Sequence, residues 1–175
     1  MFNVELFKKR LKTKVISNKI IYKPSTNSTN YDAWEMFEKH KQENIVIIAN
    51  EQLRGKGRGE KKWFSKINKS IICSFIVKEK FSKEKIGLHS ILIPVGIITG
   101  MQKIINEKFS IKWPNDVFLN NKKICGILIE SKTINGILYF NIGIGINVNE
   151  DKKDFPKEIK ESATSLKIES NHEIQ

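Results

Sequence analysis

The stretch KKICGILIESKTINGILYFNIGIGINVN (residues 122–149) decides the fold. It holds two runs rich in β-branched and aromatic residues, separated by Asn135-Gly136, a pair that favours a tight hairpin turn. Just upstream, IKW (111–113) and VFLN (117–120) read as shorter strands, with a second turn at Asn120-Asn121. We therefore predict a series of strands that pair mainly as antiparallel hairpins.

The remaining elements are predicted from the same periodicities. Buried strands are expected at IVIIAN (45–50) and SIICSFIV (70–77), and a short one begins at 20–22. An amphipathic helix is expected over 3–14, a second over 31–42 capped by Ser28, Thr29 or Asn30, and a long core helix over 87–106 with Pro94 inside it. The fold class predicted is α+β, with a mixed, largely antiparallel sheet covered by helices.

Length and composition indicate one globular domain over residues 1–175. The chain has 39% hydrophobic and 29% charged residues, as in ordinary globular proteins. We find no run near the ~18 apolar residues of a membrane span, and the first residues lack a signal-peptide apolar stretch. A cytoplasmic protein without a membrane partner is expected.

The formal charge of +12 comes mostly from lysines spread along the chain, with arginine at positions 10, 54 and 58. DNA readers usually gather arginines and aromatics on one face, so no DNA partner is expected. Cys73 and Cys125 lie in strand-like runs without CxxC spacing and are predicted to be buried thiols. The three histidines form no HxxxH pattern, and their side chains are not expected to bind metal.

A glycine-rich segment, LRGKGRGEKKWFS (53–65), follows the strand at 45–50. Glycines let backbone N–H groups point at an anion, and the interleaved cations could add charge-assisted hydrogen bonds to phosphate. It matches neither the Walker nor the dinucleotide pattern. A solvated basic loop without a ligand is the alternative.

Three further motifs could carry chemistry. In KWPND (112–116), Asn115 and Asp116 begin the next strand, although for this segment alone a simple turn with Trp113 in the core is the favoured explanation. Lys123 heads the strand KICGILIE and matters only if it turns towards an anion. GIGINVN (143–149) carries two glycines, which weaken a strand unless a ligand or backbone comes close, and Asn147 beside them could bond a ligand or cap the strand.

Taken together and in this order, the motifs resemble those of biotin–protein ligases. STN before a helix, a glycine–arginine loop ending in KWFS, KWPND, KKIxGILxE and GIGINV occur in that order in the family, and the resemblance covers roughly residues 3–168. It implies a biotin/lipoate ligase-like catalytic domain that activates biotin with ATP to biotinyl-5′-AMP and transfers it to a lysine of a biotin carboxyl carrier protein.

The resemblance also implies roles for individual residues. The residues expected to bind biotin are Ser28, Thr29, Gln52, Gly55, Lys56, Lys123 and Gly126. Those expected to bind ATP or the adenylate are Arg58, Trp63, Lys112, Asn115, Asp116 and Asn147. Lys123, Arg58 and Asp116 are the expected catalytic residues, and Mg²⁺ is expected to bind through substrate phosphates without a dedicated protein site. Ser25 and Thr26 are the rival assignment for the Ser-Thr pair.

The sequence also departs from the family pattern. Lys56 replaces an arginine and Glu60 stands where glycine is common, so we predict faster release of biotinyl-AMP than in relatives. The family's N-terminal helix-turn-helix and small C-terminal β-barrel have no counterpart in these 175 residues, which suggests a catalytic domain cut short at its C-terminal end. The alternatives are a transfer-deficient biotin-binding module and a lipoate–protein ligase. A homodimer is compatible with the sequence.

Overall fold

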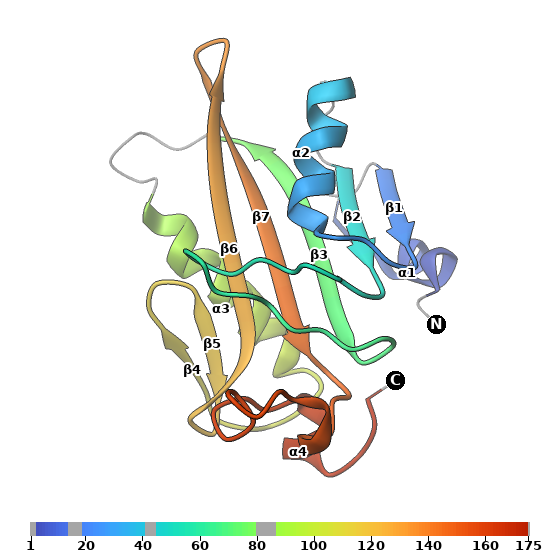
Figure 1. The fold of residues 1–175 in the computed structure, drawn as a ribbon, viewed down its shortest axis with the longest axis vertical. Helices are drawn as coiled ribbons and strands as arrows, with labels where there is room; N and C mark the ends of the chain where they lie inside the picture. The colour runs from blue at the N-terminus through green and yellow to red at the C-terminus, as the bar shows by residue number, and fades with distance from the viewer. Residues whose placement is uncertain (1–2, 14–18, 41–44, 80–86, 175) are drawn as a thin grey trace.

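The computed structural model describes residues 3–13, 19–40, 45–79 and 87–174. Seven strands form a single sheet in the order β1-β2-β3-β7-β6-β5-β4 (Figure 1). The strands are β1 (Lys19–Lys23), β2 (Ile45–Ala49), β3 (Ser70–Lys78), β4 (Phe109–Lys112), β5 (Asp116–Leu119), β6 (Lys122–Ile134) and β7 (Ile137–Asn147). The β1–β2 pair is parallel and the other pairs are antiparallel, which confirms the predicted mixed sheet.

Both predicted hairpin turns are confirmed, and backbone sterics explain them. Asn120 and Asn121 have φ of 48° and 64°, and Asn135 and Gly136 have φ of 51° and 76°. Two successive positive φ values define the type I′ turn, which matches the twist of antiparallel strands and which asparagine and glycine tolerate best. These turns fix β5–β6 and β6–β7 as the hairpins at the centre of the molecule.

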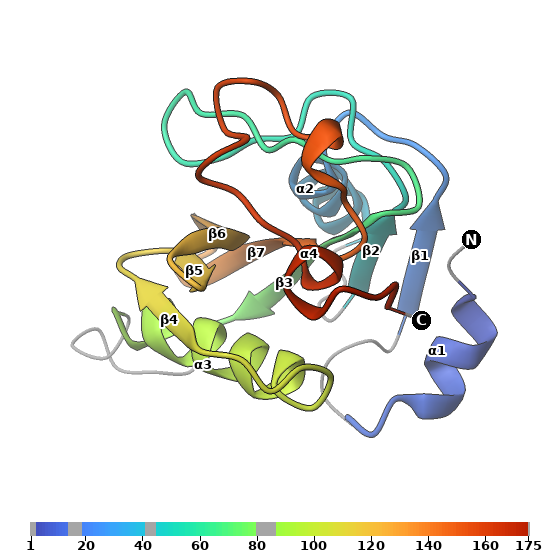
Figure 2. The same ribbon diagram turned by 90° about the horizontal axis from the view of Figure 1, so that it is seen from below.

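The helices cover opposite faces of this sheet. Viewed from below, α2 (Thr29–His40) lies on one face and α3 (His89–Met101) on the other (Figure 2). The remaining helical segments are α1 (Val4–Arg10), η2 (Lys152–Asp154) and α4 (Leu166–Ser170). α1 ends at Arg10, so the first helix is shorter than the predicted span of 3–14. α2 begins two residues earlier than predicted, and its predicted end at 42 lies outside the described residues.

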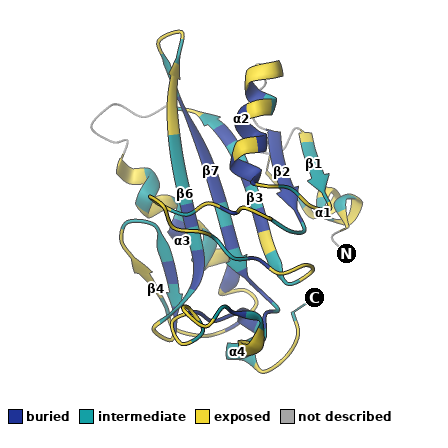
Figure 3. Ribbon diagram, in the orientation of Figure 1, coloured by how far each residue is buried: buried dark blue, intermediate teal, exposed yellow. Residues whose placement is uncertain are grey.

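The prediction of a core helix over 87–106 is partly wrong. α3 ends at Met101, and much of its apolar surface faces solvent, with Ile91, Leu92 and Val95 46–51% exposed (Figure 3). The helix is apolar nearly all round, so periodicity could not tell which side packs on the sheet. Pro94 lies within the helix and is buried.

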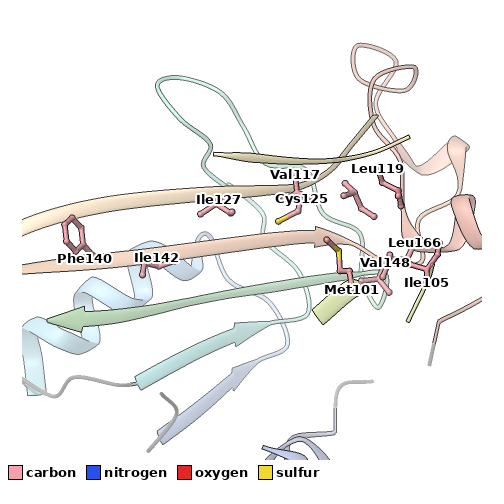
Figure 4. Close-up of a cluster of buried hydrophobic side chains, with 11 residues drawn as sticks. Met101, Ile105, Val117, Leu119, Cys125, Ile127, Phe140, Ile142, Val148 and Leu166 are labelled. Carbon is pink, nitrogen blue, oxygen red and sulfur yellow. The ribbon is translucent and has the colours of Figure 1, made fainter. Parts of the chain in front are cut away.

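The buried core is split by the sheet. The larger cluster includes Met101, Val117, Ile127 and Phe140 and lies between β5–β7 and the α3 side (Figure 4). The smaller one joins α2 to β2 and β3 through Ala33, Trp34, Phe37, Ile45, Ile47, Ile76 and Tyr139. Because these clusters hold both sides of the sheet, the face of β6 and β7 beside α2 forms a rigid floor for the site described next.

Candidate functional site

A cavity of about 970 Å³ lies over β6 and β7, a size usual for small-molecule sites. Its wall comes from the start of α2, the glycine-rich loop, the β4–β5 connection and the segment 155–163. Of the predicted site residues, Ser28, Thr29, Gln52, Lys56, Arg58, Trp63, Lys112, Asn115, Asp116, Lys123, Gly126 and Asn147 line it. Gly55 does not; it lies beside Gln52, whose Nε2 would be 2.8 Å from a Cβ at that position.

One end of the cavity is polar and buried. Ser28 and Thr29 are 4% and 2% exposed where α2 begins. The Oε1 of Gln52 accepts from the Thr29 backbone N–H at 2.7 Å and from Thr29 Oγ1 at 3.0 Å. Gln52 thus satisfies a backbone donor at the helix start, which the sequence had assigned to a side chain of the Ser28–Asn30 segment. The rival Thr26 donates to Asp32 at 2.7 Å, and it does not line the cavity.

The glycine-rich loop folds into a small hairpin. Gly57 N–H donates to Lys61 O at 2.7 Å and Trp63 N–H to Gly55 O at 2.9 Å, with Gly59 at the turn (φ +66°). These two N–H groups are therefore engaged within the loop and do not point at an anion. Arg58, at the tip, is exposed, so the loop offers cationic side chains to the cavity.

Side chains of the chain itself fill the space left by the strand glycines. Cβ atoms at Gly126 and Gly145, which are paired across β6 and β7, would lie 2.9 Å and 2.3 Å from the Trp63 ring. A Cβ at Gly143 would lie 2.0 Å from Asn30 Oδ1. The glycines thus allow close approach, as GIGIN suggested, and here the approaching groups are the indole and an amide.

Lys123 turns inward at the middle of the cavity. Its Nζ lies 2.7 Å from Asp116 Oδ1, on the neighbouring strand β5, and 5.9 Å from the centre of the Trp63 ring. Both partners of the ion pair are partly exposed, at 35% and 22%. An ammonium has three N–H donors, so Lys123 can bond an anionic ligand group while it keeps its contact with Asp116.

The KWPND segment forms one side of the opening. Asn115 Nδ2 donates to Ile127 O at 3.0 Å, which ties the segment to β6, and Lys112 Nζ lies 5.0 Å from the Phe118 ring centre. Trp113 is 74% exposed and lines the cavity, so the alternative that placed it in the core is wrong.

The opposite wall was missed by sequence reasoning. Phe155, Ile159 and Ala163 line the cavity, and Lys123 N–H donates to Ser162 O at 2.8 Å, which brings this segment against β6. Asn147 Nδ2 donates to Thr164 O at 2.9 Å. The segment has no regular periodicity, and the ATSL quartet that ends it was the only local signal available.

Outside the cavity, Cys125 is buried as predicted, whereas Cys73 is of intermediate exposure. Both are free thiols, and burial raises the pKa of Cys73 to about 12 and also raises the pKa of Cys125. Neither is therefore poised as a thiolate nucleophile. Among the helices in the described ranges, none is long and apolar enough to cross a membrane.

The fold and cavity place this chain in a known class of proteins. It belongs to the biotin/lipoate A/B protein ligase family, whose model matches residues 22–149. Among curated proteins it is similar to the bifunctional ligase/repressor BirA of Bacillus spizizenii, at 34% identity over 168 residues, which cover 94% of this chain and 51% of that protein. It is also similar to the human biotin–protein ligase, at 28% identity over 84% of this chain and 21% of that protein.

Solved structures agree with this assignment. The biotin protein ligase of Aquifex aeolicus in complex with biotin and ATP has a TM-score of 0.74 and 28% identity, covering 90% of this chain and 63% of that one. The Leishmania major ligase in complex with biotinyl-5-AMP also scores 0.74, at 22% identity over 88% and 65% of the two chains, and shows the shared fold. The chain spans about half the length of the two Bacillus BirA relatives that it matches.

Proposed function

We propose that this chain joins biotin and ATP into biotinyl-5′-AMP and transfers the biotinyl group to a lysine of a biotin carboxyl carrier protein. The observation that carries the proposal is the arrangement of one continuous cavity. It runs from a buried polar end at Thr29 and Gln52, past Lys123, to the cationic loop at Arg58. The Aquifex aeolicus neighbour, described in complex with biotin and ATP, supports the same use of the cavity here.

The polar end suits the ureido ring of biotin. A buried site that fixes donors and acceptors selects ligands able to pair with all of them, because unpaired buried polar groups are costly. Thr29 and Gln52 supply such groups, and apolar atoms of Ile72, Ile127 and Ile144 line the adjoining wall for the ring and chain. The biotin carboxylate would then extend along β6 towards Lys123.

Activation brings two anions together, and the cations between them lower that barrier. A carboxylate oxygen attacks the α-phosphorus of ATP, a P–O bond forms, the bond to the β-phosphate bridging oxygen breaks, and pyrophosphate leaves. Lys123 would stabilise the charge at the carboxylate and α-phosphate, and Arg58 the departing phosphates. Mg²⁺, bound through the phosphates, would supply further charge neutralisation. Trp63, Lys112, Asn115 and Asn147 line the cavity where the nucleotide would bind.

Transfer needs a neutral amine. The carrier lysine attacks the acyl carbon, a C–N bond forms, the C–O bond to phosphate breaks, AMP leaves, and the amine gives up a proton. Asp116, 2.7 Å from Lys123, is the carboxylate at this point of the cavity and would accept that proton. The acceptor is a biotin carboxyl carrier domain, and we place the reaction in the cytoplasm.

The test is intact-mass analysis of an apo carrier domain incubated with this chain, ATP, Mg²⁺ and either biotin or lipoate. We expect a biotin-sized increment on the carrier, lost in Lys123→Ala and kept in Lys157→Ala, because Lys157 is exposed and does not itself line the cavity. A lipoate-sized increment instead would assign the chain to the lipoate branch of the family. Biotin binding without an increment would identify a transfer-deficient module.

A further inference from the structure

The indole of Trp63 rests directly on the sheet that forms the floor of the cavity. A Cβ at Gly145 would lie 2.3 Å from the ring, and a Cβ at Gly126 would lie 2.9 Å from it. These two glycines are partners across β7 and β6, so the indole occupies a gap that both strands leave for it. Any group that lies on this part of the floor has to take the place of the ring.

The ring lies between the two groups that the proposed biotin site joins. Two residues further along β7, Gly143 lies against the side chain of Asn30, the neighbour of Thr29 at the polar end. In the opposite direction, Lys123 Cε would be 3.4 Å from a Cβ at Gly126, and its Nζ lies 5.9 Å from the ring centre. A ligand that runs along the sheet from Thr29 to Lys123 therefore crosses the place that the indole fills.

Hydrogen bonding does not hold the indole in this place. In the described part of the chain, Trp63 Nε1 is buried and has no hydrogen-bond partner. Trp34 differs, because it is 8% exposed and its Nε1 donates to Glu130 at 3.3 Å. A buried N–H without an acceptor weakens the position it occupies, since it has given up a hydrogen bond to water. Trp63 is only half-buried, so its ring can leave the floor without unpacking the core.

The backbone at Trp63 can stay in place while the ring moves. Trp63 N–H donates to Gly55 O at 2.9 Å, and two residues later Ser65 Oγ accepts from Gln52 N–H at 3.1 Å. These bonds fix the base of the glycine-rich hairpin. Rotation about the side-chain bonds of Trp63 is therefore enough to clear the floor.

We propose that Trp63 is a plug that biotin displaces: its indole fills the floor between Thr29 and Lys123 and swings outwards before the ligand lies there. The inference rests on the proposed function, because it assumes that the ligand runs along β6. The plug lowers the rate of biotin association in proportion to the fraction of molecules whose floor is open. Trp63 thus controls the entry of biotin, besides lining the part of the cavity where the nucleotide would bind.

The experiment measures the association rate constant of tritiated biotin without ATP, by rapid mixing and a chase with unlabelled biotin. Trp63→Ala should bind at least about tenfold faster than the wild type, because a minor open conformation is typically populated at roughly 10% or less. Trp63→Phe, whose smaller ring fills less of the floor, should lie between them. Leu53→Ala removes an exposed side chain of the same loop that does not line this cavity, and it should leave the rate unchanged. Equal rates, within about twofold, in the wild type, Trp63→Phe and Trp63→Ala overturn the inference.

A second measurement uses the wild type and decides the matter if Trp63→Ala does not fold. The indole N–H protons of the three tryptophans are recorded by ¹⁵N–¹H NMR, and Trp63→Phe identifies the Trp63 signal. Saturation with biotin should expose this proton and make its exchange with water at least about tenfold faster, whereas the Trp34 proton, bonded to Glu130, should keep its rate.

The outcomes separate the plug from the proposed function. Unchanged or slower exchange of the Trp63 proton in protein saturated with biotin shows that the ring stays on the floor, and it overturns this inference alone. A wild-type chain that binds no biotin overturns the proposed function, and the inference falls with it.

Discussion

At the polar end of the cavity, Thr29 and Asn30 are 2% and 5% exposed and are hydrogen-bonded to side chains from three different strands or loops. At the other end, Lys56 and Arg58 are exposed on a hairpin whose backbone bonds are made within the loop. The first region is preorganised by its own network before any ligand arrives. The second offers charge without fixed geometry.

This contrast fits the two halves of the proposed reaction. A neutral ring must be selected by shape and by the direction of its hydrogen bonds, which requires a rigid site. A polyphosphate is attracted by charge at longer range, and the groups around it can order on binding. Mutations at the polar end should therefore alter stability and ligand selection, whereas mutations at the loop should alter rates and leave stability nearly unchanged.

The largest effect on the reaction rate is expected at Lys123, where the biotin and nucleotide parts of the cavity would meet. Lys123→Ala removes the cation that would face both the biotin carboxylate and the α-phosphate, and the rate of biotin-dependent pyrophosphate release should fall roughly 10²–10³-fold. Because Lys123 is 35% exposed, the urea midpoint should change little. Lys157→Ala serves as control. If the rate in Lys123→Ala fell less than threefold, residues other than Lys123 would have to stabilise the activation of biotin.

The second prediction concerns Glu150, behind the nucleotide end. Its side chain is fully buried, Ser70 Oγ donates to it, and burial raises its pKa from 4.5 to about 7. Between these values the unfolded chain loses the proton that the native chain keeps. The free energy of unfolding should thus fall as pH rises from about 4.5 to 7, by on the order of 3 kcal/mol, and level off above.

Glu150→Gln tests this directly, since the amide keeps an acceptor for Ser70 and cannot ionise. Urea unfolding at pH 8 should show the variant to be more stable than the wild type, and at pH 5 the two should agree closely. The neighbouring charges of Lys69, Asp151 and Asp154 are the same in both proteins. Equal stability of the two proteins at pH 8 would mean that Glu150 reaches water in the native state.

Features that depend on neighbouring residues could be predicted from the sequence, whereas features that depend on contacts between distant residues could not. The turns at 120–121 and 135–136 were predictable because positive φ is a property of two adjacent residues. The bond from Asn30 to Glu130 joins residues 100 positions apart and left no local trace. Periodicity also does not encode tertiary packing. It therefore could not predict that β1 lies beside β2 in the sheet, or which side of α3 faces solvent.

For the site, nearly all the residues that the sequence motifs predicted do line the cavity, and their roles stay predictions. Motifs carry this information because residues that contact one ligand recur at fixed positions. Asn30 was considered only as a helix cap, although it lines the cavity. Its partners Ser74 and Asn141 were missed, since polar residues within apolar strands look like tolerated exceptions until their partners are known. The alternative that placed Trp113 in the core is wrong although a large aromatic beside a strand usually packs inward.

Substitution of the two glycines of β7 should distinguish the rigid polar end of the cavity from the end formed by the glycine-rich loop. Gly143→Ala would place a Cβ 2.0 Å from Oδ1 of Asn30, a residue that is held by hydrogen bonds to Glu130, Ser74 and Asn141. Overpacking there should cost about 1–3 kcal/mol of unfolding free energy. Gly145→Ala meets the half-buried Trp63 ring at 2.3 Å, and that ring can swing outward. It should cost less stability and instead alter tryptophan fluorescence. Thermal melts of both variants measure this difference. Equal losses of stability in Gly143→Ala and Gly145→Ala would contradict the contrast between a rigid and an adaptable end of the cavity.

The smallest effect on stability, with a specific effect on rate, is expected at the loop tip. Arg58 is exposed, so Arg58→Ala should change the unfolding free energy by less than about 0.5 kcal/mol. If its guanidinium holds the adenylate, biotinyl-AMP should leave about tenfold faster, the equivalent of one charge-assisted hydrogen bond.

Release is measured by trapping freed biotinyl-AMP after a chase with unlabelled biotin. Lys56→Arg and Glu60→Gly, which restore the pattern of relatives, should slow release from the wild-type rate, because a guanidinium bonds phosphate bidentately and a carboxylate nearby repels it. Acceleration by Arg58→Ala together with slowing by the two reversions would show that retention depends on the charge of this hairpin. Release unchanged in all three would instead assign retention to the rigid end of the cavity.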